Sequence, residues 1–112
     1  MKFLHVTVQT VKFEEEIEFY QKEAGLTIQR DMRPVRDLVF LANADGETCV
    51  EVIRNPEAGN RNLSVGFRAD DVEKKREDMI AAGYEVTPII SPSPDVKFFF
   101  VNDPAGLSVQ FI

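Results

Sequence analysis

Apolar and polar residues alternate over residues 3–8, the first patterned stretch of the chain. This period of two predicts a β-strand whose polar residues His5 and Thr7 share one face. From residue 12 the apolar residues recur at helical spacing, which predicts a helix over 12–24 that ends at Gly25. The chain therefore opens with a strand followed by a helix.

Three more strands are predicted before the middle of the chain, over residues 26–32, 37–42 and 47–53. The turn-forming residues 43–46 indicate a hairpin between the last two of these strands. Residues 55–60 are polar and contain Pro and Gly, which favours a linker between two halves.

The second half repeats this order. A strand over 63–68 precedes a helix for which Asp70 is the predicted N-cap, with Glu73 in the capping-box position, and which Gly83 ends. The predicted buried side of this helix is formed by Val72, Met79, Ile80 and Ala82. A strand over 85–90, a rigid proline-containing loop over 91–95 and strands over 96–101 and 107–112 follow. The unit β-α-β-β-β thus occurs twice, and this repetition indicates a duplicated architecture.

The parity of the strands predicts two different sheet faces. One face is apolar and is expected to pack against the helices; it carries Leu4, Val6, Val8, Val50, Val52, Leu63, Val65, Phe67, Leu107, Val109 and Phe111. The other is polar and mostly small; it carries His5, Thr7, Cys49, Glu51, Ser64, Gly66, Ser108 and Gln110. A small, polar face is typical of a cavity lining, so this face is the predicted ligand site.

Composition narrows the classes of function. The 112 residues fit one domain, and the formal net charge of -6 disfavours a nucleic acid partner. Cys49 is the only cysteine, so no intrachain disulfide can form. No apolar stretch reaches the length of a membrane span or a signal peptide, so we expect a cytoplasmic protein without a membrane partner.

Several short motifs occur in a characteristic order: the His5 strand, Phe19-Tyr20 before Gly25-Leu26, Phe67 before Asp70-Asp71-Val72, Ala82-Gly83, and Asp103-Pro104-Ala105-Gly106 before the last strand. In this order the chain resembles the vicinal oxygen chelate superfamily, which includes glyoxalase I, bleomycin resistance proteins and extradiol dioxygenases. The resemblance covers essentially the whole chain. It implies a single α+β domain of two βαβββ modules (1–53 and 62–112, with a linker over 54–61), in which a curved mixed sheet has the helices on its outer face. It also implies a homodimer.

In metal-dependent members of that superfamily, four inward side chains hold one divalent ion, and the resemblance places these positions at His5, Glu51, Ser64 and Gln110. A divalent Zn, Ni, Mn or Fe ion is the cofactor that this set implies. Ser64 stands where a His is usual and is a poor ligand, and Gln110 is a weaker, neutral substitute for a Glu.

The sequence is consistent with two functions. The first is a small-molecule-binding protein with a degenerate metal site, whose predicted pocket is lined by His5, Thr7, Cys49, Glu51, Ser64, Phe98, Phe100, Ser108 and Gln110. The alternative is a glyoxalase-like metal-dependent lyase or isomerase that uses His5, Glu51 and Gln110, with Glu51 as the catalytic base. An extradiol dioxygenase is disfavoured, since its iron requires two His ligands and the chain has one His.

Each candidate also has a structural interpretation. His5 is a core histidine bonded to a neighbour in that interpretation, and Glu51 is a carboxylate tied to an Arg or to Ser64, because an unpaired buried charge is costly. The Phe98-Phe99-Phe100 run is mostly core, although alternation sends Phe98 and Phe100 to the face opposite Phe99. Arg30, Arg33 and Arg36 lie around the second and third strands. One of them is a candidate to attract an anionic ligand, but the sequence does not select which.

Overall fold

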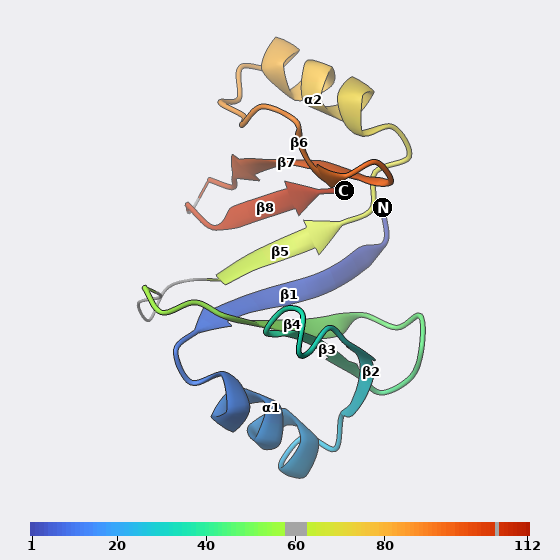
Figure 1. Ribbon diagram of the computed structural model, residues 1–112. Coiled ribbons are helices and arrows are strands. Elements are labelled where there is room, and N and C mark those ends of the chain that lie inside the picture. Colours follow the sequence, from blue (N-terminus) through green and yellow to red (C-terminus); the bar gives the residue numbers. More distant parts are fainter. Residues whose placement is uncertain (58–62, 105) are drawn as a thin grey trace. The chain divides into compact units, whose positions relative to one another are not determined.

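The computed structural model describes residues 1–57, 63–104 and 106–112. Within them the order β-α-β-β-β occurs twice, which confirms the predicted α+β arrangement (Figure 1). The elements are β1 (Phe3–Thr10), α1 (Phe13–Lys22), β2 (Thr27–Asp31), β3 (Leu38–Ala42), β4 (Cys49–Arg54), β5 (Leu63–Phe67), α2 (Val72–Ala81), β6 (Ile90–Ser93), β7 (Val96–Asn102) and β8 (Ser108–Phe111). Residues 58–61 of the predicted linker 54–61, and Ala105 of the predicted turn 103–106, lie outside the described residues.

The chain divides into two compact units. The first unit comprises His5–Leu63, and the second combines Ser64–Ile112 with Met1–Leu4. The strand order is β2-β3-β4-β1 in the first unit and β5-β8-β7-β6 in the second. Parallel pairs (β1 with β4, β5 with β8) therefore adjoin antiparallel ones in both units, and β3 and β4 form the predicted antiparallel pair.

The core of the first unit lies between α1 and the sheet. The helical spacing of Phe13 and Ile17 turns both side chains toward β3 and β4, and these residues are 0% and 5% exposed. The fully buried sheet residues that meet them are Val39, Leu41 and Val52. Burial of each such side chain contributes roughly 1.5–3 kcal/mol, so this cluster is a main source of stability in the first unit.

The second unit has a smaller core. Its core cluster consists of the buried residues Ala69, Val72 and Phe99, and the partly buried Met79 and Phe111 pack against them. Two other residues of the predicted buried side of α2 are exposed, namely Ile80 (48%) and Ala82. The prediction was wrong at these positions because α2 ends at Ala81 and meets the sheet mainly through Val72 and Met79.

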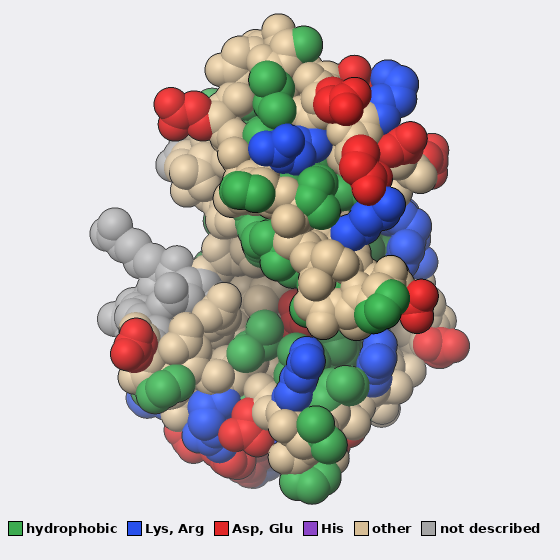
Figure 2. Space-filling view, turned by 45° about the horizontal axis from the view of Figure 1, so that its top comes forward, with side chains coloured by type: hydrophobic (Ala, Val, Ile, Leu, Met, Phe, Trp, Pro, Cys, Tyr) green, Lys and Arg blue, Asp and Glu red, His purple; other side chains and the backbone are tan. Residues whose placement is uncertain are grey.

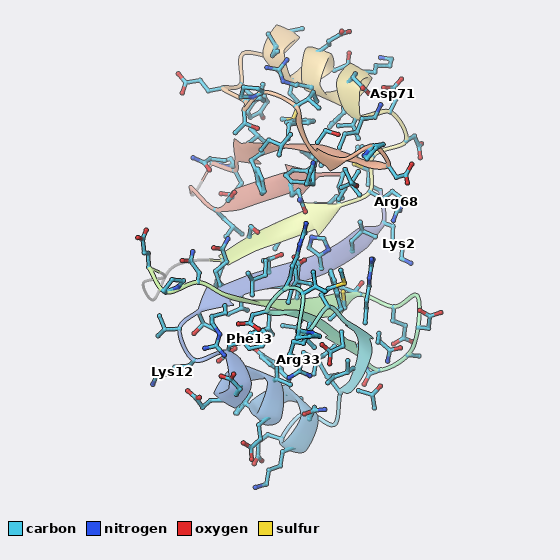
Figure 3. All side chains as sticks on the ribbon, in the orientation of Figure 1. Lys2, Lys12, Phe13, Arg33, Arg68 and Asp71 are labelled. Carbon is cyan, nitrogen blue, oxygen red and sulfur yellow. The ribbon has the colours of Figure 1, made fainter. Side chains whose placement is uncertain are left out.

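The helix boundaries agree with the glycine signals but not with the predicted cap. Gly25 and Gly83 have φ of +70° and +92°, the left-handed conformation in which glycine ends a helix. Asp71, not Asp70, caps α2, and its carboxylate accepts a hydrogen bond from the Lys74 backbone N–H at 3.0 Å (Figure 3). The predicted N-cap is therefore wrong by one residue, and the predicted capping box is wrong because Lys74, not Glu73, is three residues after the cap.

A second correction concerns residues 85–95. The predicted strand 85–90 is absent from this described stretch, where Val86 forms only an isolated bridge with Val101. The strand β6 instead includes Pro92, in the segment predicted to be a loop. Prolines are tolerated there because β6 lies at the edge of its sheet and pairs only with β7, so few of its N–H groups need a partner.

The predicted apolar face is buried only in part. Val52 is fully buried, but Leu63 and Leu107 are 48% and 36% exposed, contrary to prediction. Both lie at or beyond the end of a strand, away from the helix contacts.

On the visible face of the molecule, acidic and basic side chains are intermixed (Figure 2). No described helix has the length and apolar character needed to span a membrane.

Candidate functional site: the polar sheet faces

The polar face of the first unit is organised by the parallel pair β1–β4. Its register places His5 beside Cys49 and Thr7 beside Glu51. Because side chains alternate along a strand and neighbouring partners share a face, these four side chains lie on the face opposite Val50 and Val52. The face opposite the α1 core thus carries an imidazole, a thiol, a hydroxyl and a carboxylate.

Glu51 is the centre of this group. Its side chain is 14% exposed, and its Oε1 accepts a hydrogen bond of 2.6 Å from the Thr7 hydroxyl. The same Oε1 lies 4.0 Å from His5 Nε2. A carboxylate that is mostly shielded from water needs such donors, since an unpaired buried charge is costly. The prediction that Glu51 pairs with an Arg or with Ser64 differs from this arrangement, in which Thr7 is the hydrogen-bond donor.

His5 lies beside the aromatic ring of Phe40, a residue that strand parity did not predict for this face. His5 is 8% exposed, and its ring centroid lies 6.5 Å from that of Phe40, at an interplanar angle of 58°. Phe40 of β3 is opposite Glu51 in the antiparallel register, so it belongs to the same face. Alternation along β3 places Phe40 on this face once the pairing of β3 with β4 is known. The sequence alone does not reveal it, because β3 is apolar on both faces.

Cys49 contributes lining rather than reactivity. Burial raises the pKa of its thiol, and the negative charge of Glu51 raises the pKa further. A raised pKa disfavours the thiolate, which is the nucleophilic form of cysteine. Cys49 is therefore suited to a neutral contact at this face.

The second unit has a corresponding face with different chemistry. Ser64 pairs with Ser108 and Gly66 with Gln110 in the parallel register of β5 and β8. Phe100 is opposite Gln110, whereas Phe99 is opposite Phe111 and belongs to the helix side, as alternation predicts. Phe98 and Phe100 are in edge-to-face contact, with centroids 5.5 Å apart. This face therefore combines hydroxyl, amide and aromatic groups and has no charged side chain among these residues.

Phe100 also borders a hollow of about 260 Å³ in the second unit. The residues that line it are Glu85, Val86, Thr87, Phe100, Val101 and Asn102. The lining residues come from the segments 85–87 and 100–102, and Thr87 links these segments because its hydroxyl accepts a hydrogen bond from the Phe100 N–H at 2.9 Å. Of the predicted pocket residues, Phe100 alone is among these six.

The sequence-predicted residues thus form two groups, each within its own unit. His5, Thr7, Cys49 and Glu51 come together in the first unit. The remaining predicted residues belong to the second unit: Ser64, Phe98, Phe100, Ser108 and Gln110. Within each unit, these residues lie on the polar side that strand parity predicts.

The donor chemistry fits poorly with a tightly held transition metal. His5 and Glu51 are strong donors, but Ser64 and Gln110 offer only neutral oxygens, which zinc and nickel bind weakly. Among the described residues, no three His, Cys, Asp or Glu side chains lie close enough together to hold a metal ion. The residues present therefore supply half of a strong ligand set.

Comparisons with known proteins give the family. A family model described as the Glyoxalase/Bleomycin resistance protein/Dioxygenase superfamily matches residues 2–111. A comparison with curated protein sequences finds no match.

Solved structures give the fold. A glyoxalase/bleomycin resistance protein/dioxygenase superfamily member from Vibrio splendidus 12B01 is 18% identical, with a TM-score of 0.70 over 98% of this chain and 96% of that chain. Methylmalonyl-CoA epimerase from Mycobacterium tuberculosis is 12% identical, with a TM-score of 0.74 over 97% of this chain and 85% of that one. The 2,3-dioxygenase LapB from Pseudomonas sp. KL28 is 21% identical, with a TM-score of 0.67 over 98% of this chain and 39% of LapB. With the family match over nearly its whole length, this chain belongs to the glyoxalase/bleomycin resistance protein/dioxygenase superfamily.

Proposed function

We propose that this protein binds a small molecule through the polar face of its first unit, with Glu51 as the main polar contact and without a tightly held transition metal. The observation that carries the proposal is the state of the Glu51 carboxylate. Thr7 holds Oε1 at 2.6 Å, while Oε2 makes no hydrogen bond with any described residue. No buried side-chain oxygen in the described part lacks a partner, so Oε2 is open to solvent and to a ligand.

This geometry favours a ligand that donates a hydrogen bond. A fixed carboxylate with one open oxygen accepts an N–H or O–H group, and a charge-assisted hydrogen bond is roughly twice as strong as a neutral one. Phe40 and His5 offer a partly apolar surface beside that oxygen. A few placed polar groups on an apolar surface are the usual composition of a small-molecule site.

The alternative is the metal-dependent lyase or isomerase that uses His5, Glu51 and Gln110, with Glu51 as base. The 4.0 Å separation of His5 Nε2 and Glu51 Oε1 supports it, because two ligands of one metal ion lie at a comparable distance. The weak donors Ser64 and Gln110 favour the binding function instead. A homodimer and a cytoplasmic location also remain predictions; light scattering of the purified chain would test the first.

The decisive experiment combines ligand and metal measurements on the wild type, Glu51→Gln and the exposed control Glu47→Gln. A small-molecule panel is screened by thermal shift, and metal content is measured by mass spectrometry after nickel, zinc, manganese and iron are offered in turn. A ligand at 100 times its Kd adds about 2.7 kcal/mol to the free energy of unfolding. We expect this stabilisation in the wild type and Glu47→Gln but a weakened one in Glu51→Gln, with substoichiometric metal throughout.

One metal ion per chain, lost in both His5→Ala and Glu51→Gln, would overturn the proposal in favour of the metal-dependent enzyme. Equal ligand stabilisation in Glu51→Gln and Glu47→Gln would remove Glu51 from the binding site.

A further inference from the structure

One cross-strand row on the polar face of the first unit runs over all four of its strands. Thr7 of β1 pairs with Glu51 of β4, and Glu51 pairs with Phe40 of β3. Phe40 in turn pairs with Arg30 of β2. Since partners in adjacent strands share a face, the row presents a hydroxyl, a carboxylate, an aromatic ring and a guanidinium in that order.

A β-bulge is the reason that Arg30 belongs to this row. Ile28 pairs with Leu41 and packs against the α1 core, and two residues later Arg30 pairs with Phe40, the neighbour of Leu41. Without the extra residue Gln29, alternation would place Arg30 on the same face as Ile28. Bulges that redirect a side chain are frequent beside functional sites. Sequence alternation alone could not reveal this change of face.

The other two arginines of this region are less suitable. Arg33 is occupied by Asp31, with its Nη2 2.5 Å and its Nε 2.8 Å from the two carboxylate oxygens, and its guanidinium lies over the Phe13 ring on the α1 side (Figure 3). Arg36 lies in the segment between β2 and β3, outside the row. Arg30 is exposed and forms no hydrogen bond or ion pair with any described side chain.

We propose that Arg30 binds the anionic end of the ligand, so that the ligand is a small organic anion with a flat apolar body and a hydrogen-bond donor at its far end. This inference rests on the proposed function. β2 and β4 are two strand spacings apart, roughly 10 Å, which suits a molecule of a few bonds lying across Phe40. The opposite charges of Glu51 and Arg30 set its direction, because the anion is repelled at one end of the row and attracted at the other.

The test uses three probes that differ in one group each. The probe trans-4-hydroxycinnamate carries a carboxylate, a flat body and a distal hydroxyl; its methyl ester lacks the anion, and cinnamate lacks the hydroxyl. Dissociation constants are measured by isothermal titration for the wild type, Arg30→Gln, Arg30→Lys and Arg36→Gln. The last variant removes the same charge outside the row and controls for the general field.

We expect the wild type and Arg36→Gln to prefer the acid over its ester by about tenfold, the value of one charge-assisted hydrogen bond. Arg30→Gln should lose this preference, and Arg30→Lys should retain part of it. Glu51→Gln should instead reduce the preference for the hydroxylated acid over cinnamate. Circular dichroism and unfolding midpoints verify that each variant is folded.

Equal binding of the acid and the ester by the wild type, or equal losses in Arg30→Gln and Arg36→Gln, would overturn the anion site. Failure of all three probes to bind would overturn this ligand class. In either case, panel ligands that bind in a Glu51-dependent manner would leave the proposed function standing. If no panel ligand depends on Glu51, the proposed function fails as well.

Discussion

The two units repeat one order of elements, but they bury their helices to different depths. In the first unit α1 contributes two buried residues, Phe13 and Ile17, to a core of five. In the second unit α2 contributes only Val72 to a core of three that includes the small Ala69. Polar contacts supplement the smaller core, such as the hydrogen bond of 2.8 Å from Arg76 Nε to the Thr87 carbonyl. Equal topology therefore does not require equal packing.

The polar faces of the two units also differ, because only the first unit has ionisable side chains at the candidate positions. The first unit presents His5 and Glu51 where the second presents Ser64 and Gln110. The ionisable groups of the candidate site thus belong to the unit with the larger buried core. A rigid supporting core helps to hold a carboxylate and its donor in place, which is what a binding site requires. The larger core cluster and the proposed ligand site therefore belong to the same unit.

The largest effect on the free energy of unfolding is expected from a matched pair of core truncations, one in each unit. Phe13 and Phe99 are both 0% exposed. We expect Phe13→Ala to lower the free energy of unfolding by about 4 kcal/mol, and Phe99→Ala to lower it by about 1 kcal/mol less. Three fully buried sheet residues, Val39, Leu41 and Val52, surround Phe13, whereas the cluster around Phe99 has no other fully buried residue among those described, so its neighbours can relax further into the space. Urea denaturation measures both, and an equal or greater loss for Phe99→Ala would contradict the comparison.

A smaller effect is expected on the polar faces. Thr7→Val removes the hydrogen bond to Glu51 while keeping the side-chain shape, and should cost about 1.5 kcal/mol. Ser108→Ala is the matched change in the second unit, where the Ser108 hydroxyl makes no hydrogen bond with any described residue; it should cost less than about 0.5 kcal/mol. Thermal unfolding would show the difference. Similar losses of stability in the two variants would mean that the Thr7–Glu51 hydrogen bond does not stabilise the first unit.

The smallest effect concerns the cations that cover an aromatic ring in each unit. Arg33 and Arg54 lie over Phe13, and Lys75 lies over Phe111. Hydrogen bonds from the Arg33 side chain and backbone hold the pKa of Asp31 at about 2, below its ordinary 3.8. Because the pKa of Asp31 is lower in the folded state than in the unfolded state, ionised Asp31 stabilises the folded protein. This stabilisation is complete above pH 3.8 and is lost as the pH falls through about 2.

Carbon-13 NMR of the carboxyl groups would measure this titration. Arg33→Gln should return the Asp31 pKa toward 3.8, whereas Arg36→Gln should leave it low. An Asp31 that already titrates near 3.8 in the wild type would show that the Arg33 contact does not persist in solution.

Much of the fold could be predicted because strand alternation and glycine stops are local signals. The strand patterns identified β1, β2, β3, β4, β5, β7 and β8. They failed over residues 85–95, where a suitable pattern around Val86 forms one bridge and the proline-containing β6 takes the edge position. Pairing partners decide such cases, and they are not encoded in the local pattern. The N-cap was misplaced by one residue because Asp70 and Asp71 are chemically equivalent as caps.

The candidate site could be predicted only where the strands are regular. Parity correctly placed His5, Thr7, Cys49 and Glu51 on one face, since β1 and β4 pair without interruption. Phe40 was missed because β3 is apolar on both faces. Arg30 could not be selected, because the bulge at Gln29 changes the parity of β2 and the sequence carries no sign of it.

Both ends of the chain are attached to one short segment of the second unit. The Lys2 carbonyl accepts a hydrogen bond from the Arg68 N–H at 3.0 Å, and the Ile112 carbonyl accepts one from the Ala69 N–H at 2.9 Å (Figure 1). A short peptide joining the two ends would therefore close the backbone into a ring with little strain. Opened again at the exposed turn 43–46, that ring would be a circular permutant that keeps the strand pairings described above, because these pairings do not depend on where the polypeptide starts.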